Sequence, residues 1–178
     1  KLIGAINCLF RDNNGQLCGT NTDGEGALRA FESSFGKLAE QRILIIGAGG
    51  TGKAVSAYFA TAASNLSKIS IVSRSNSAKE IAKKIGCIGT SWESIPDLIP
   101  NADIIINCTS LGSNLHPDIV PLEFDQMKKI KKEAIVYDVV YDPSPTLLLI
   151  NAEKLGFRHM DGSAMNFEQA VIGFNYAA

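Results

Sequence analysis

Short apolar runs alternate with amphipathic stretches from residue 42 onward. Residues 42–47 form a continuous apolar run that ends in glycine, as expected for a strand buried on both faces of a sheet. Strands that alternate with helices at this spacing predict a Rossmann-like, doubly wound parallel α/β sheet. The further predicted strands are 69–72, 87–92, 103–107, 134–138 and 157–160, and the helices are 53–63, 78–85, 146–155 and 163–176, with an irregular stretch around Pro117 and Pro121.

The first part of the chain does not follow this alternation. Residues 6–10 and 16–20 are β-prone and flank the turn signal Asp12-Asn13-Asn14-Gly15, so they are predicted to form two extended segments. A short helix is predicted over residues 24–34, where apolar residues recur at near-helical spacing. The opening segment is therefore predicted to be the edge of another domain.

Composition narrows the classes of function. A chain of 178 residues with 46% hydrophobic residues can build a real core, which excludes intrinsic disorder. The net charge of −1 gives no electrostatic case for binding nucleic acid or an anionic membrane. No apolar run approaches the ~20 residues of a membrane helix. The chain opens without Met and without the shape of a signal peptide, so we expect its numbering to begin inside a longer gene product.

The cysteines and histidines predict no metal site. Cys8, Cys18, Cys87 and Cys108 stand apart in the sequence, and only two histidines are present. Isolated cysteines of this kind are usually small buried hydrophobic residues. Unpaired thiols also favour a reducing compartment, so we expect a cytoplasmic protein.

The glycine-rich segment after residue 46 fits two phosphate-binding patterns. A Rossmann loop uses Gly47, Gly49 and Gly52, whereas a Walker loop needs a hydroxyl at position 54, where this chain has Ala54. Dinucleotide binding is therefore favoured, with a nucleotide triphosphatase or a purely structural turn as alternatives. The predicted cofactor loop is Gly47, Ala48, Gly49, Gly50, Thr51 and Gly52.

The end of the second predicted strand indicates which dinucleotide binds. NAD sites carry an acidic residue about here, but this chain has Ser73, Arg74 and Ser75. A guanidinium and hydroxyls attract the 2′-phosphate that a carboxylate would repel. The sequence therefore predicts NADP over NAD; the alternative is that Arg74 is an ordinary solvated charge.

Six short motifs occur in a fixed order along the whole chain. They are Gly4-Ala5-Ile6-Asn7 with Gly19-Thr20-Asn21-Thr22-Asp23-Gly24, the glycine loop, Ser73-Arg74-Ser75, Asn107-Cys108-Thr109-Ser110-Leu111-Gly112, Val140-Tyr141-Asp142-Pro143 with Thr146-Leu147-Leu148, and Asp161-Gly162 with Met165 and Gln169-Ala170. In this order they resemble the motifs of the shikimate dehydrogenase family (shikimate/quinate 5-dehydrogenases).

The resemblance implies a reaction and roles for individual residues. The family reduces 3-dehydroshikimate to shikimate reversibly with NADP, and a Lys–Asp pair handles the hydroxyl proton. Asp23 would be the catalytic Asp, with a helix cap as its structural alternative. The remaining implied roles are substrate binding by Asn7, Tyr141 and Gln169 and cofactor binding by Thr109, Ser110, Gly162 and Met165.

The resemblance also implies a division into three parts. Residues 1–24 would be a short remnant of a separate α/β substrate domain, 25–160 the NADP-binding domain, and 161–178 a helix that packs back on the substrate domain. The family's catalytic Lys lies well upstream of the first motif, so Lys1 is too close to serve, and we expect these residues to be inactive alone.

Several features depart from the family pattern and keep other interpretations open. Ala78 stands where NADP enzymes often have a second basic residue, and Ala164 replaces a glycine near the nicotinamide. A quinate or related polyol-acid dehydrogenase, and a catalytically incomplete nucleotide-binding module, are the alternative functions. A homodimer is also left open.

Overall fold

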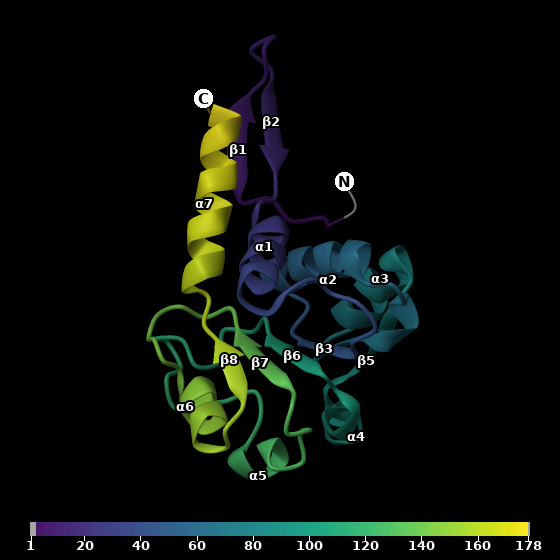
Figure 1. The fold of residues 1–178 in the computed structure, drawn as a ribbon. Coiled ribbons are helices and arrows are strands. Elements are labelled where there is room, and N and C mark those ends of the chain that lie inside the picture. The colour runs from purple at the N-terminus through teal and green to yellow at the C-terminus, as the bar shows by residue number, and fades with distance from the viewer. Residues whose placement is uncertain (1–2, 178) are drawn as a thin grey trace.

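A six-stranded parallel sheet forms the centre of the protein, whose computed structural model describes residues 3–177 (Figure 1). Counted from β3, the spatial order is 3-2-1-4-5-6, which is the doubly wound order of dinucleotide-binding sheets. The predicted fold class is therefore confirmed. Along the sheet the strands are β5 (Ile88–Ser91), β4 (Ile69–Ser73), β3 (Ile43–Ile46), β6 (Ile104–Asn107), β7 (Ile135–Asp138) and β8 (Arg158–Met160).

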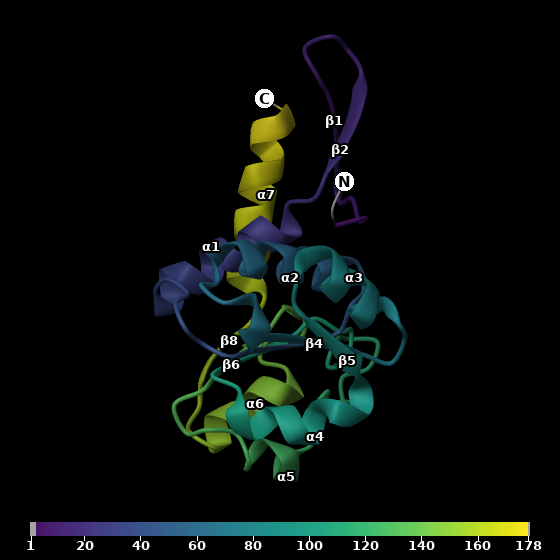
Figure 2. The ribbon, with the colours of Figure 1, turned by 90° about the vertical axis from the view of Figure 1, so that its right-hand side faces the viewer.

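Two layers of helices cover the two faces of this sheet (Figures 1 and 2). Ile43 and Ile45 pack into one core cluster, whereas Leu44 and Ile46 pack into the other, so the central strand is apolar at every position. One face carries α1 (Asp23–Phe35), α2 (Gly50–Ala62) and α3 (Ser77–Ile85), and the other carries α4 (Ile95–Leu98), α5 (Phe124–Met127) and α6 (Leu147–Lys154).

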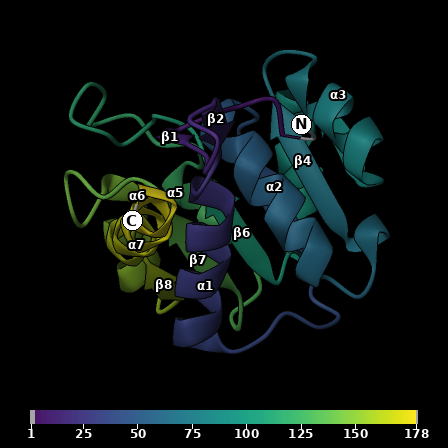
Figure 3. The ribbon, with the colours of Figure 1, turned by 90° about the horizontal axis from the view of Figure 1, so that it is seen from above.

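A hairpin and the last helix project from this body. Strands β1 (Cys8–Arg11) and β2 (Leu17–Thr20) pair antiparallel as a separate two-stranded sheet. Helix α7 (Ser163–Ala177) runs beside them and beside α1, as Figure 3 shows from above. The rings of Phe10 and Tyr176 lie 4.8 Å apart and join the hairpin to α7. Lys1 lies outside the described residues.

Some elements differ from their predicted bounds. Helix α2 begins at Gly50 rather than at residue 53, because the glycine loop itself supplies its first turn. Ile6 precedes β1 and is exposed. Helices α4 and α5 were not predicted, since four residues are too few to show a period. Among residues 3–177, 3₁₀ turns also occur at Leu66–Lys68, Trp92–Ser94 and Ile99–Asn101.

Among residues 3–177, no helix is long and apolar enough to cross a membrane.

Candidate functional site

A cleft of about 420 Å³ opens at the carboxyl edge of the sheet, where the strand order reverses between β3 and β6. We call it the glycine-loop cleft. Ligands of doubly wound sheets bind outside the carboxyl ends of the strands at such a reversal. Its lining residues come from the ends of four neighbouring strands: Gly47, Ala48, Gly49, Ser73, Arg74, Ser75, Ser77, Trp92, Cys108, Thr109 and Ser110.

The glycine loop leaves room for a ligand beside the first turn of α2. Gly47 has a φ of +104°, which L side chains rarely adopt, and a Cβ on Gly52 would overlap the carbonyl oxygen of Gly47. A Cβ on Gly49, in contrast, would meet no atom within 4 Å. The loop therefore leaves open space at Gly49, directly before the N-terminus of α2, and helix N-termini suit phosphate groups.

The turn after β4 presents cationic and hydroxyl groups to this cleft. The Ser73 hydroxyl donates to the carbonyl of Ser75 at 2.6 Å and accepts from the N–H of Ala78 at 3.1 Å, so it holds the turn together. Ala78 is buried in the core. The groups left facing the cleft are Arg74, Ser75 and Ser77, the last being the first residue of α3.

Trp92 is a cleft residue that sequence reasoning missed. The guanidinium of Arg74 lies 5.8 Å from the centroid of the Trp92 ring, within the range of a cation–π contact. Trp92 begins a 3₁₀ turn directly after β5. It is the only tryptophan of the chain, so it provides a specific optical signal from this cleft.

The segment after β6 forms the opposite wall of the cleft. The Asn107 side-chain carbonyl accepts from the Thr109 N–H at 3.0 Å and from its hydroxyl at 2.7 Å, which places Thr109 and Ser110 at the cleft. Burial raises the pKa of the Cys108 thiol far above its usual value, with a smaller contribution from Asp138. Cys108 is therefore a protonated wall residue rather than a nucleophile.

A second hollow of about 340 Å³, which we call the Asp23 pocket, lies on the other side of the glycine loop. Thr51 contributes to this pocket, whereas Gly47 and Gly49 of the same loop line the cleft. The loop thus forms part of both sites. The lining residues of the pocket come from five separate segments: Asn7, Asp23, Thr51, Val139, Tyr141, Met165, Asn166 and Gln169.

A polar network joins the hairpin, α1 and α7 at this pocket. The Asn7 amide donates to the Asp23 carboxylate at 2.6 Å and to the Thr22 hydroxyl at 3.0 Å, and the Asn7 carbonyl accepts from the Thr22 N–H at 2.9 Å. The Thr22 hydroxyl in turn donates to the Gln169 carbonyl at 3.2 Å. Thr22, which is 1% exposed, therefore links Asn7 to Gln169, and Asn7 extends the network to Asp23.

The Asp23 carboxylate faces the pocket and does not cap α1. The N-cap of α1 is Thr22, and the Asp23 carboxylate turns toward Asn7 and the pocket. Partial burial raises the pKa of Asp23, while hydrogen bonds from Asn7 and Thr51 oppose this change. A carboxyl group at a pocket wall with a raised pKa is a candidate general acid or base.

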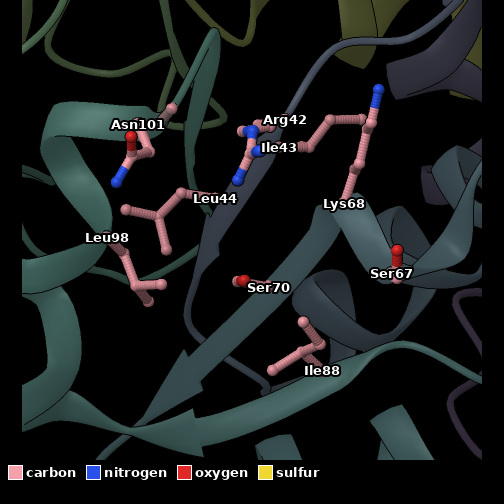
Figure 4. Close-up of a pocket in the computed structure, with 10 residues that line it drawn as sticks. Arg42, Ile43, Leu44, Ser67, Lys68, Ser70, Ile88, Leu98 and Asn101 are labelled. Carbon is pink, nitrogen blue, oxygen red and sulfur yellow. The ribbon is translucent and has the colours of Figure 1, made fainter.

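A third hollow, of about 140 Å³, lies at the opposite edge of the sheet (Figure 4). Arg42 and Asn101 lie on one side of it and Ile88 on the other. The Lys68 ammonium extends away and pairs with Glu40 at 2.6 Å. Because this hollow is at the amino ends of β3 and β4, it is remote from the glycine loop at their carboxyl ends.

The sequence family follows from comparison with known proteins. A family model described as shikimate/quinate 5-dehydrogenase matches residues 29–140, which is more than half of the chain. The chain belongs to this family. A shikimate dehydrogenase (NADP⁺) of Brucella abortus is 37% identical over 178 residues, covering 98% of this chain but 60% of the relative. The chain therefore spans about 60% of the length of such curated relatives.

Solved structures of family members share the fold. A quinate dehydrogenase from Corynebacterium glutamicum in complex with NAD superposes with a TM-score of 0.85 at 30% identity, covering 98% of this chain and 63% of that one. A shikimate 5-dehydrogenase from Thermus thermophilus in complex with NADP(H) and shikimate gives 0.81 at 27% identity, covering 98% and 62%. Family members thus bind either dinucleotide.

The residues of the family motifs are distributed between the glycine-loop cleft and the Asp23 pocket. Asn7, Asp23, Tyr141 and Gln169 gather in the Asp23 pocket as a group. Met165, which the resemblance assigns to the cofactor, lines this pocket instead, and Gly162 is buried directly before α7. Besides Trp92, sequence reasoning missed as site residues Ser77, Cys108, Val139 and Asn166, none of which carries a phosphate-binding signature of its own.

Proposed function

We propose that this chain is the cofactor-binding part of an NADP-dependent shikimate dehydrogenase, which reduces 3-dehydroshikimate to shikimate reversibly. One observation carries the proposal: the glycine loop separates a phosphate-binding cleft from a pocket in which Asn7, Asp23 and Gln169 meet from distant parts of the chain. Hydride transfer needs a dinucleotide and a hydroxylated substrate side by side, and these two hollows meet that need.

The cleft residues fit NADP. The open N-terminus of α2 suits the pyrophosphate, and Arg74 with the hydroxyls of Ser75 and Ser77 suits the 2′-phosphate. The acidic residue that would repel this phosphate is absent from the end of β4. Bound NADPH would supply the hydride for the reduction, and NADP⁺ would accept it in the reverse reaction. Thr109 and Ser110 would line the middle of the dinucleotide, and Gly162 and Met165 would lie toward its nicotinamide end.

Asp23 would exchange the proton of the substrate hydroxyl. As a carboxylate it accepts a hydrogen bond from that hydroxyl, while Asn7 holds it in place at 2.6 Å. Asn7, Gln169 and Tyr141 would bind the substrate's other oxygens. Among the described residues, no lysine lines the pocket. We propose that the lysine partner implied by the family motifs comes from outside these 178 residues, and that they bind cofactor but turn over little shikimate alone.

The proposed division of the chain follows from these roles. Residues 1–24, with the hairpin, and residues 161–178, with α7, would form the substrate side, and residues 25–160 would form the NADP-binding domain. The hairpin and α7 present exposed apolar side chains, Leu9, Leu17 and Phe174 among them. The unpaired cysteines favour a reducing, cytoplasmic setting. A homodimer is compatible with this division.

Quinate is the second candidate substrate. The quinate dehydrogenase of Corynebacterium glutamicum matches this chain with a TM-score of 0.85 at 30% identity, which is comparable to the match with the Thermus thermophilus shikimate enzyme. Both acids present neighbouring hydroxyls to amide and carboxylate groups. Comparing kcat/KM for shikimate and quinate in a catalytically competent protein that contains these residues separates the two.

Titration of the 178-residue chain with NADP⁺ and NAD⁺ tests the cofactor. A charge-assisted contact to the 2′-phosphate contributes about 1.5–3 kcal/mol, so NADP⁺ should bind roughly tenfold tighter or more. Calorimetry measures both affinities, and the fluorescence of Trp92 reports occupancy of the cleft independently. Equal affinities would overturn the assignment.

Two variants make this titration specific. Arg74→Ala should remove most of the preference for NADP⁺ and leave NAD⁺ binding nearly unchanged. Lys79→Ala is the matched control, because Lys79 carries the same charge on α3 but does not line the cleft. A similar loss in both variants would mean that general positive charge, rather than a contact from Arg74, sets the preference.

A further inference from the structure

Asp138 is a fully buried carboxylate to which the proposed chemistry gives no role. It ends β7 and is 0% exposed. Its Oδ1 accepts hydrogen bonds from the Asn107 amide at 2.9 Å and from the Val140 N–H at 3.1 Å. Its Oδ2 accepts from the Thr146 hydroxyl at 2.7 Å. A buried polar group with this many partners connects the segments that supply them.

One of these connections reaches the glycine-loop cleft. The Asn107 amide also donates to the carbonyl of Leu111 at 3.2 Å, while its carbonyl accepts both hydrogen bonds from Thr109. If the amide were flipped, its NH₂ group would face the Thr109 N–H, donor against donor. An ionised carboxylate at position 138 accepts only, so it fixes the amide in the orientation that holds Thr109 at the cleft wall.

The other connections reach the Asp23 pocket. Val140 lies between Val139 and Tyr141, which both line that pocket, and its carbonyl accepts from the Gly162 N–H at 3.1 Å. The hydrogen bond from the Val140 N–H to Asp138 therefore ties the pocket segment to the same carboxylate. Thr146, the N-cap of α6, anchors Oδ2 of that carboxylate from the far side.

We propose that Asp138 is a positioning residue that fixes the segment after β6 relative to the segment after β7, so that the cleft and the pocket keep one mutual geometry. The expected effect of Asp138 on cofactor binding rests on the proposed function, whereas its expected effect on the two segments does not. Asp138 touches neither hollow, and it acts through Asn107 and Val140.

Three variants of the 178-residue chain test this role. Asp138→Ala removes every acceptor and should weaken NADP⁺ binding at least about tenfold, since buried donors are left unpaired. Asp138→Asn can keep Oδ1 toward Asn107 and Val140, so the loss should stay within about threefold. Asp103→Asn is the matched control: Asp103 precedes β6 at the opposite edge, where it accepts from the Arg42 N–H at 2.8 Å, and NADP⁺ affinity should not change.

Two measurements separate positioning from simple stability. Calorimetry gives NADP⁺ affinity per folded molecule, and amide hydrogen exchange without ligand should show faster exchange at residues 108–111 and 139–141 together in Asp138→Ala alone. If Asp138→Ala melts lower but binds NADP⁺ and exchanges at both segments like the unaltered chain, the role is only structural and the proposal is wrong. Failure of the unaltered chain to bind NADP⁺ would instead overturn the proposed function, and the exchange data would still decide the role of Asp138.

A reciprocal exchange covers the case in which Asp138→Ala does not fold. Asn107→Asp places two carboxylates against each other and should weaken NADP⁺ binding about tenfold or more. Adding Asp138→Asn restores an amide–carboxylate pair and should recover most of the affinity. Absence of this recovery would contradict the proposal.

Discussion

The glycine-loop cleft and the Asp23 pocket lie on either side of one loop but are built in different ways. The cleft is lined by residues between positions 47 and 110, all at or close after the carboxyl ends of four neighbouring strands of one sheet. The pocket uses longer polar side chains from residues 7 to 169, held by hydrogen bonds between segments that are not neighbours in the chain. The cleft is therefore a property of the sheet, whereas the pocket depends on how the hairpin, α1 and α7 assemble around it.

The largest expected effect separates the two sites completely. In a catalytically competent protein, Asp23→Asn should lower kcat by at least about a hundredfold, because general acid–base groups are typically worth 10²–10⁴-fold. Cofactor affinity should not change, since Asp23 does not line the cleft. Steady-state kinetics and NADP⁺ titration measure the two quantities. A variant that melts many degrees lower but keeps its turnover per folded molecule would show that Asp23 is only structural.

A smaller effect should come from the glycine loop. In Gly52→Ala the new Cβ overlaps the Gly47 carbonyl, and overpacking of this kind costs about 1–3 kcal/mol. Melting temperature should fall, and NADP⁺ and NAD⁺ should weaken equally, by about tenfold. Gly49→Ala is the control: its Cβ meets open space, so binding should weaken without loss of stability. Thermal melts and titrations of both variants decide, and identical behaviour of the two would contradict this geometry.

The third expected effect is a pH dependence of the free energy of unfolding that arises from Asp138, which connects the two sites. Burial raises the pKa of Asp138 to about 6, with a smaller contribution from Asp161, against hydrogen bonds from Thr146, Val140 and Asn107. The folded chain therefore binds a proton between about pH 4 and 6 that the unfolded chain does not. The contribution of this extra proton on Asp138 to the free energy of unfolding is present in full below about pH 4. It is lost as the pH rises through 6.

Denaturant titrations of the unaltered chain and of Asp138→Asn measure this contribution as the difference between their free energies of unfolding. Other carboxylates, such as Asp103 and Asp161, have lowered pKa values and the opposite pH dependence. Their effect is common to both proteins and cancels in the difference. From pH 7 to 5, the free energy of unfolding should rise in the unaltered chain relative to the variant by about 1 kcal/mol. A parallel course of the two curves would show that Asp138 does not titrate in this range.

The smallest effect should concern one hydroxyl of the cleft. Ser75→Ala should weaken NADP⁺ about two- to fivefold, since a hydrogen bond contributes about 0.5–1 kcal/mol in an exposed site. NAD⁺ should bind as before. The Ser75 hydroxyl contacts Ser77 at 3.0 Å, so Ser77→Ala should have a similar effect. Titration by calorimetry resolves changes of this size, and weaker NAD⁺ binding in either variant would contradict a role at the 2′-phosphate.

The cleft could be predicted from sequence because its signals are local. The run from Arg42 to Gly47 shows both a buried strand and the turn that follows it, and Ser73 with Arg74 stands where that fold places the ribose. For the pocket, periodicity gave no indication that Asn7 would meet Gln169 across 162 positions. That grouping was expected only through resemblance to a family.

Other features escaped sequence reasoning for physical reasons. Trp92 follows a short edge strand, and nothing in its neighbours shows that it turns toward Arg74. Helix α4 contains Pro96 in its first turn and has four residues, too few for an apolar period to be visible. The role of Thr22 depends on its burial among three segments, which no linear pattern records.

The separation of Asn7 from Gln169 has a consequence for the chain as it is made. Every residue of the glycine-loop cleft has been synthesised by position 110, but the Asp23 pocket waits for position 169. At roughly 5–20 residues per second, this delay is about 3–12 seconds. During that interval every residue that lines the cleft is already present, while Asn7 and Asp23 still lack their partner on α7.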